Sequence, residues 1–452
     1  MKKNKCLLWI AGCIVTALSS CLGDVTVSEW NLSNCQIQSF ALSNDSIEGL
    51  SDVVFTIDQV NGLIFNRDSM PYGTVIDRKV VCTVEFVLGY VSSIKIYPEA
   101  TQESIEWNGS DSIDFSAPVR FIIESYDKKE IKTYLASLNV HQQKPDSVEW
   151  VRCSSPLPEG KTIRDQKVIA WNGDYLMYVK ESSGIVLYRS PVTDAVTWSP
   201  ESPEGFPQSG VLSQLTEYNG KLYLPSSDGV LYQSSDGLTW DIVGSTPSIV
   251  ALLGTLPAAE QVERSAILTA IVKDDNVLSF AAMDTAMQWQ TGVETPSVFP
   301  VTGFGSASYV SGYYPHRMVV AGKDRNGQLS NMAWDTMNGL SWVSLTEEGT
   351  SYFEQKEGVM VASYDDCFYM IGGINASNEA TRDMYVSYDK GISWVLTDSA
   401  KILPETFQPR GYASFLVDEA QYMLLFGGKE KTNTDMLNEL WRGRINRLGF
   451  KE

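Results

Sequence analysis

Between about Leu32 and His141, short runs of apolar and β-branched residues alternate with polar ones, and this period of two is typical of half-buried strands. Clear runs cover residues 53–57, 80–86 and 93–97. Turn signals such as Asn61-Gly62 lie between the runs. Because the strands recur closely over about 110 residues, residues 32–141 predict a β-sandwich.

A polar segment that contains Pro145 follows at residues 142–146 and predicts a linker. Beyond it, tryptophan recurs at the end of similar short phrases, with spacings of 48, 42, 49, 53 and 52 residues. These residues are Trp150, Trp198, Trp240, Trp289, Trp342 and Trp394. A period of about 40–50 residues is typical of propeller blades with four short strands each. Residues 147–452 therefore predict a β-propeller, and the whole chain is expected to be all-β.

The strand pattern at the two ends of this region predicts how the propeller closes. The last repeat offers three strands, at residues 412–417, 422–428 and 439–445, and it lacks a fourth. Residues 148–152 form a fourth strand without the first three. We therefore expect the N-terminal strand to complete the C-terminal blade, which gives six blades and covers an open strand edge.

The first 21 residues carry an export pattern. A basic segment, Met1 to Lys5, precedes an apolar run from Cys6 to Leu18 that is too short for a permanent membrane span. The run ends in Leu18-Ser19-Ser20-Cys21, which resembles a bacterial lipobox. The resemblance implies a signal peptide over residues 1–20, lipidation of Cys21 and a tether over residues 21–31. The alternative is an ordinary secretory signal with a chance cysteine.

These signals favour an outer-membrane lipoprotein, held to the membrane by its acyl chains alone. Asp24 is the one early acidic residue after Cys21, which is a weak indication of surface exposure and leaves the leaflet open. The net charge of −20 argues against nucleic acid and anionic membrane surfaces as partners, because both attract basic proteins.

Four cysteines follow Cys21, and their wide spacing predicts no structural zinc site. They are Cys35, Cys82, Cys153 and Cys367. Cys35 and Cys82 fall in one domain and could pair in an oxidising compartment. Buried free thiols, which behave as small hydrophobes, are the preferred interpretation.

Several motifs resemble those of known propeller families. Ser387 to Trp394 resembles the Asp-box of sialidase-like propellers, and Ser234 to Trp240 is a version one residue shorter. Gly372-Gly373, Gly427-Gly428 and the segment 409–414 resemble kelch and galactose-oxidase-like blades. The N-terminal region resembles immunoglobulin- or cadherin-like modules. The whole chain resembles a two-domain lipoprotein family of Bacteroidota, and these likenesses imply fold rather than activity.

No catalytic constellation is evident. The arginine cluster of sialidases has no counterpart that can be placed, and the copper site of galactose oxidase needs more histidine than His141 and His316 supply. We therefore expect no metal and no other cofactor. Tyr313 to Arg317 is an aromatic and basic cluster, and we interpret it as the turn that enters a strand.

Loops that enter the innermost strands of a propeller converge on one face. They predict a mouth with three cations among three aromatic side chains, which would suit an anionic or carbohydrate ligand. These candidate ligand-binding residues are Arg164, Lys356, Arg410, Phe206, Phe304 and Tyr412. The alternative is that each side chain is held by its own blade.

The sequence therefore predicts a binding protein of the cell envelope, with a glycan or a partner protein as ligand. The second hypothesis is a glycoside hydrolase or lyase that uses carboxylates and tyrosines at the mouth. The third is a structural subunit of an outer-membrane complex.

Overall fold

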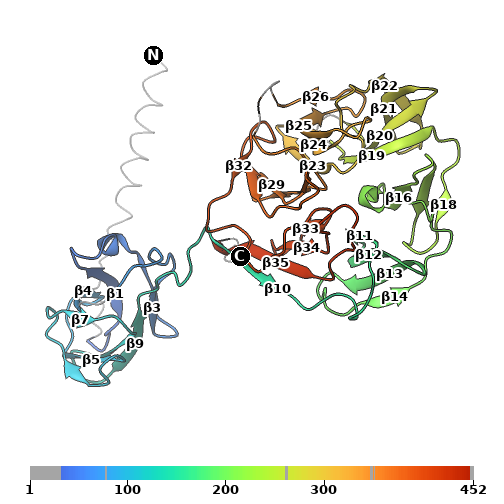
Figure 1. The fold of residues 1–452 in the computed structure, drawn as a ribbon. Helices are drawn as coiled ribbons and strands as arrows, with labels where there is room; N and C mark the ends of the chain where they lie inside the picture. Colours follow the sequence, from blue (N-terminus) through green and yellow to red (C-terminus); the bar gives the residue numbers. More distant parts are fainter. Residues whose placement is uncertain (1–31, 77–78, 260–262, 347–349, 351, 448–452) are drawn as a thin grey trace, which may run out of the picture. The chain divides into compact units, whose positions relative to one another are not determined.

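The computed structural model describes residues 32–76, 79–259, 263–346, 350 and 352–447. The expected signal peptide, Cys21 and the tether lie outside these residues. The chain divides into two compact units, Met1–Pro145 and Asp146–Glu452, and each is described by itself. Apart from two short 3-10 helices, the regular elements of both units are strands (Figure 1).

The first unit consists of two sheets, with strand orders β1-β4-β7 and β2-β3-β9-β8-β5-β6. All neighbouring strands are antiparallel except β3 and β9. The elements are β1 (Ile37–Ser43), η1 (Leu50–Asp52), β2 (Phe55–Asp58), β3 (Leu63–Asn66), β4 (Lys79–Phe86), β5 (Ser93–Pro98), β6 (Ile105–Glu106), β7 (Ile113–Asp114), β8 (Val119–Glu124) and β9 (Ile131–Ser137).

One hydrophobic core joins these two sheets. Phe40 on β1 makes edge contacts with Phe55 on β2 and with Phe121 on β8, at ring-centroid distances of 5.0 and 5.8 Å. Cys35 and Cys82 are buried free thiols in the same core. Burial raises the pKa of Cys82 to about 12, so its thiol is protonated and behaves as an apolar side chain.

The described strands of the second unit fall into six sheets. The first three are four-stranded meanders: β11 (Asp165–Trp171), β12 (Asp174–Glu181), β13 (Gly184–Pro191), β14 (Ser199–Glu201); β15 (Thr216–Tyr218), β16 (Lys221–Pro225), β17 (Leu231–Ser234), β18 (Asp241–Ile242); and β19 (Ser248–Leu256), β20 (Ile267–Asp274), β21 (Val277–Met283), β22 (Trp289–Glu294). The short helix η2 (Leu212–Gln214) precedes β15.

The other three sheets are less uniform. The fourth holds β23 (Gly305–Ser311), β24 (Tyr314–Lys323), β25 (Leu329–Thr336) and β26 (Val343–Ser344), and β27 (Lys356–Glu357) and β30 (Ile374–Asn375) extend it. The fifth holds β28 (Met360–Tyr364), β29 (Cys367–Ile371), β31 (Met384–Ser387) and β32 (Val395–Leu396). The sixth has the order β10-β35-β34-β33, with β10 (Val148–Arg152), β33 (Ser414–Val417), β34 (Met423–Phe426) and β35 (Leu440–Ile445).

Strands from the two ends of the second unit therefore share one sheet. Val148 pairs with Ile445 and Arg152 pairs with Trp441, in an antiparallel register (Figure 1). Trp150 donates its indole N–H to the backbone carbonyl of Lys401 at 2.9 Å. The first strand of the unit is thus fixed to residues almost 300 positions away.

A hairpin with one hydrogen-bond pattern recurs at the third connection of several sheets. Asp389 accepts hydrogen bonds from the Ser387 hydroxyl and from the Ser393 amide, both at 2.9 Å. Gly391 takes a φ of 98°, and Trp394 is buried just beyond. The segment from Ser234 to Trp240 has the same arrangement around Asp236. The motif therefore works as a turn that delivers a tryptophan to the core.

A third copy of this hairpin, not predicted from the sequence, lies at residues 336–342. Asn338 takes the place of the aspartate and accepts a hydrogen bond from the Ser341 amide at 3.0 Å. Gly339 donates its amide to the Thr336 hydroxyl at 2.9 Å. The side-chain oxygen of asparagine can cap turn amides as aspartate does, so Asn-Gly before Ser-Trp was the available signal.

Replacing Asp389 with alanine is expected to lower the free energy of unfolding by about 1–2 kcal/mol, because the turn loses its side-chain acceptor. Denaturant unfolding of the two proteins measures the difference. Asp241→Ala is the matched control, since Asp241 is exposed on β18. An equal effect of the two substitutions would contradict the capping role.

Candidate functional site

Arg410, one of the expected ligand-binding cations, lies fully inside the protein. Its side chain is 0% exposed and forms an ion pair with Glu439 at 2.6 Å. The guanidinium also donates to the backbone carbonyls of Gln408 and Gly427 and lies over the ring of Phe407. Arg410 therefore has no surface to offer to a ligand.

Lys356 and Phe206 are buried as well. The Lys356 side chain is 1% exposed, forms an ion pair with Asp383 at 3.0 Å and donates to the Thr381 hydroxyl at 2.9 Å. Phe206 packs against Tyr178 and Trp240, at ring-centroid distances of 5.3 and 5.1 Å. These side chains are held within the protein by contacts with a neighbouring sheet, since Asp383 precedes β31 of the fifth sheet and Tyr178 lies on β12 of the first.

The other three candidate residues have different surroundings. Arg164 is exposed and pairs with Asp435 at 3.0 Å. Tyr412 donates its hydroxyl to Glu357, and its pKa is raised by burial and then by this hydrogen bond. Phe304 lines a central cavity, and Arg164 is not among the residues of that lining.

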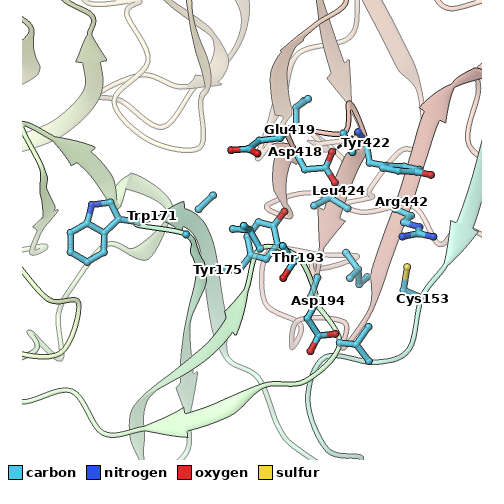
Figure 2. Close-up of a pocket in the computed structure, with 18 of the residues that line it drawn as sticks. Cys153, Trp171, Tyr175, Thr193, Asp194, Asp418, Glu419, Tyr422, Leu424 and Arg442 are labelled. Carbon is cyan, nitrogen blue, oxygen red and sulfur yellow. Dashed lines mark hydrogen bonds between the residues drawn. The ribbon is translucent and has the colours of Figure 1, made fainter. Parts of the chain in front are cut away.

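A larger pocket, of about 630 Å³, lies between the first and the sixth sheets of the second unit (Figure 2). Three connections build it: the turn from β11 to β12, the segment from β13 to β14 and the turn from β33 to β34. Its lining includes Cys153, Trp171, Tyr175, Thr193, Asp194, Val196, Val417, Asp418, Glu419, Tyr422, Leu424, Leu440 and Arg442. The volume is in the range of pockets that hold small molecules.

The pocket combines an apolar floor with a polar rim. Leu424 and Tyr175 lie on the floor, while Figure 2 shows Asp418 and Glu419 on one side of Tyr175 and Asp194 on the other. Burial raises the pKa of Tyr175 to about 12, and the charges of the two acids on the β33–β34 turn add to the effect. Carboxylates and a neutral phenol thus face the same space.

The three carboxylates of the rim differ in the hydrogen bonds that they form within the protein. Asp418 accepts the Tyr422 amide at 2.7 Å, so it caps its own turn. Asp194 accepts the Thr197 amide at 3.1 Å. Glu419 is exposed, and in the described part of the chain it has no hydrogen bond or ion pair. Glu419 is therefore available to accept hydrogen bonds from a ligand.

The cationic side of the pocket is partly occupied by internal contacts. Arg442 and Arg444 lie over the ring of Tyr422, at 4.8 and 4.3 Å from its centroid. Burial raises the pKa of the Cys153 thiol, and the nearby charge of Arg442 opposes the rise. This corner can donate hydrogen bonds through Arg442, whose guanidinium already lies over the Tyr422 ring.

This pocket is not evident from the sequence because its walls come from turns about 250 residues apart. Asp418 and Glu419 between two apolar runs were the local signal, and their proximity to Asp194 depends on which sheets are neighbours. In the described residues no three His, Cys, Asp or Glu side chains are grouped to hold a metal ion. No helix among them is long and apolar enough to cross a membrane.

These sheets belong to a β-propeller: residues 144–452 match the family described as the DUF6242 beta propeller domain. Residues 31–138 match the family described as the domain of unknown function (DUF6242) N-terminal domain. The chain therefore belongs to the two-domain DUF6242 family.

The comparison with curated proteins finds no match. Among solved structures, one titled "Structure of YjhT" resembles the chain with a TM-score of 0.46 and 15% sequence identity. The similarity covers 63% of this chain and 96% of that chain.

Proposed function

We propose that this protein is a cell-envelope lipoprotein whose propeller binds a glycan without converting it. The pocket between the first and sixth sheets carries this proposal. An apolar floor suits the C–H face of a sugar, and Glu419 on the rim suits its hydroxyl groups as an acceptor. Arg442 adds a donor on the opposite side.

The proposal includes an architecture, in which six blades form a ring that β10 closes. The six sheets and the pairing of β10 with β35 support it. The paired glycines at residues 372–373 and 427–428, all with positive φ, support a kelch-like relationship. The two sheets around one core in the first unit support an immunoglobulin- or cadherin-like spacer. Anchoring at Cys21 in the outer membrane, with the propeller at the cell surface, rests on the export pattern.

The alternative functions have less support from the pocket. A glycoside hydrolase needs two carboxyl groups free to act on the bond between sugars. Asp418 and Asp194 already bind backbone amides, and this leaves Glu419 as the uncommitted acid of the rim. A partner protein could instead insert an apolar side chain beside Val196, which is 54% exposed.

A glycan-array screen of the purified protein, with released sugar assayed in the same wells, tests the proposal. Binding without release is the expected result. Release of product would replace the proposal with the hydrolase or lyase. Absence of both would contradict glycan binding and favour a partner protein.

Replacing Val196 with arginine is expected to weaken binding of the selected glycan at least about tenfold, because the long side chain fills the pocket. Glu419→Gln should weaken binding several-fold, since it removes a charged acceptor and keeps the shape. Titration calorimetry measures both effects. Val277→Arg is the matched control, because Val277 is 47% exposed and does not line this pocket. Equal affinity of V196R and the unmodified protein would contradict the assignment of the site.

A further inference from the structure

A second cavity, of about 230 Å³, lies on the axis of the propeller. One edge strand of each of the six sheets, namely β11, β15, β19, β23, β28 and β33, contributes to its wall; the residues are Lys167, Thr216, Leu253, Ser306, Val361 and Phe415. At about 30 Å³ per water molecule, the space equals the share of roughly eight waters. It is separate from the pocket of Figure 2 in its lining, so a ligand held here goes beyond the proposed function.

The charge of this cavity has one sign. Lys167 on β11 and Arg317 on β24 line it, and no aspartate or glutamate is among the described lining residues. Among the residues that the structure describes, the Lys167 ammonium has no hydrogen bond or ion pair. Two cations on the wall of one cavity, with no carboxylate among its described lining residues, attract an anion from solution.

The Arg317 guanidinium is held in a fixed orientation. It donates from Nε to the Leu253 carbonyl at 2.8 Å and from its two Nη atoms to the hydroxyls of Ser308 and Ser306, at 3.0 and 2.6 Å. Arginine has five N–H donors, so two are left for another acceptor. Gly254 has a φ of +102°, and a Cβ atom there would overlap the guanidinium, so this glycine makes room for Arg317.

Burial lowers the pKa of both cations. It lowers the pKa of Lys167, the charge of Arg317 lowers it further, and Asp165 opposes the change. Burial also lowers the pKa of Arg317 to about 10. The charged form of each group is therefore less stable in the free protein than in water, and a bound anion would stabilise both charged forms.

We propose that Lys167 and Arg317 bind a compact oxyanion in the axial cavity, such as the carboxylate of a sugar acid or a phosphate group. Arg317 supplies its two remaining N–H donors, and Lys167 supplies a point charge. The cavity admits a group about the size of one monosaccharide, so the oxyanion either ends a larger ligand or belongs to a small one.

Titration calorimetry of the purified protein with galacturonate, inorganic phosphate and galactose tests this proposal. Lys167→Met is expected to weaken binding of the oxyanions at least about tenfold. Lys273→Met is the control, since Lys273 is exposed and lies outside the cavity. Binding of both anions, or of one alone, supports the site and identifies which oxyanion it accepts. Binding by neither, or equal binding by K167M, would overturn the proposal.

A stability measurement separates a binding role from a structural one. Without ligand, K167M should raise the melting temperature by about 2–4 °C, because it replaces an uncompensated charge with an apolar side chain of similar length. A lower melting temperature would show that Lys167 stabilises the fold, and that result would also overturn the proposal. The V196R protein should keep its oxyanion affinity, so failure at this cavity and failure at the Figure 2 pocket can be told apart.

Discussion

Replacing Arg410 with alanine is expected to lower the free energy of unfolding by about 3–5 kcal/mol. Glu439 would lose its 2.6 Å ion pair, and the carbonyl of Gly427 would lose a donor. Because Arg410 is fully buried, water cannot replace the guanidinium without a rearrangement. The same carboxylate pairs with Arg152 on β10 at 2.8 Å, so Glu439 would keep one exposed cation as a partner after the substitution.

Chemical denaturation of the purified protein measures this effect. Arg382→Ala is the control, because Arg382 is exposed and has no ion pair among the described residues. A loss below about 1 kcal/mol for Arg410→Ala would contradict a buried structural role and would return Arg410 to the candidate ligand-binding residues.

The pH dependence of the free energy of unfolding gives a second test of the Arg410–Glu439 ion pair. Burial tends to raise the pKa of Glu439, but the hydrogen bond and charge of Arg410 outweigh it and hold the pKa below its ordinary value of 4.5. A carboxyl with a lowered pKa in the folded state stabilises the fold above about pH 4.5 and loses that contribution as the pH falls through its folded pKa. Glu439→Gln should therefore flatten the loss of stability on acidification.

Replacing Val151 with proline is expected to cost about 2–4 kcal/mol and to release β10 from the sixth sheet. The backbone amide of Cys153 donates to the carbonyl of Leu440, and the amide of Asn446 donates to the carbonyl of Ser147. In an antiparallel pair every second residue forms such hydrogen bonds, so between these two ends the odd-numbered residues of β10 bond to β35. Val151 pairs with Arg442 in this alternation, and proline there removes a donor between the strands.

Val151→Thr is the matched control, because threonine keeps the amide and suits a strand. Denaturant unfolding measures the cost, and limited proteolysis near residues 146–153 reports the release of the strand. Equal stability and equal protease resistance of the two variants would contradict a role for β10 in holding the ring together.

The all-β fold and the propeller domain were predictable because both depend on local patterns. Alternating apolar residues specify strands, and a buried tryptophan shortly after a turn with Asp or Asn and Gly marks a repeat, as Trp240, Trp342 and Trp394 show. A residue pattern with a period of two also predicts which side chains of a strand face the core. These signals need no knowledge of distant neighbours.

The candidate site was not predictable in the same way. A loop cation such as Arg410 or Lys356 resembles a ligand-binding residue until the structure shows the carboxylate beside it. Glu439 lies 29 residues from Arg410, and Asp383 lies 27 residues from Lys356. Lys167 is the reverse example, because nothing in the sequence of its strand marks it as a candidate ligand-binding residue. Its side chain lines the axial cavity and has no hydrogen bond or ion pair in the described part of the chain. That position depends on the arrangement of all six sheets.

Hydrogen-exchange mass spectrometry, with and without the glycan that the array selects, tests the central claim most directly. The account predicts slower exchange of backbone amides in residues 171–175, 192–196 and 417–422, which form the pocket of Figure 2. Protection at other loops of the propeller, with these three segments unchanged, would contradict the claim that this pocket is where the protein binds its ligand.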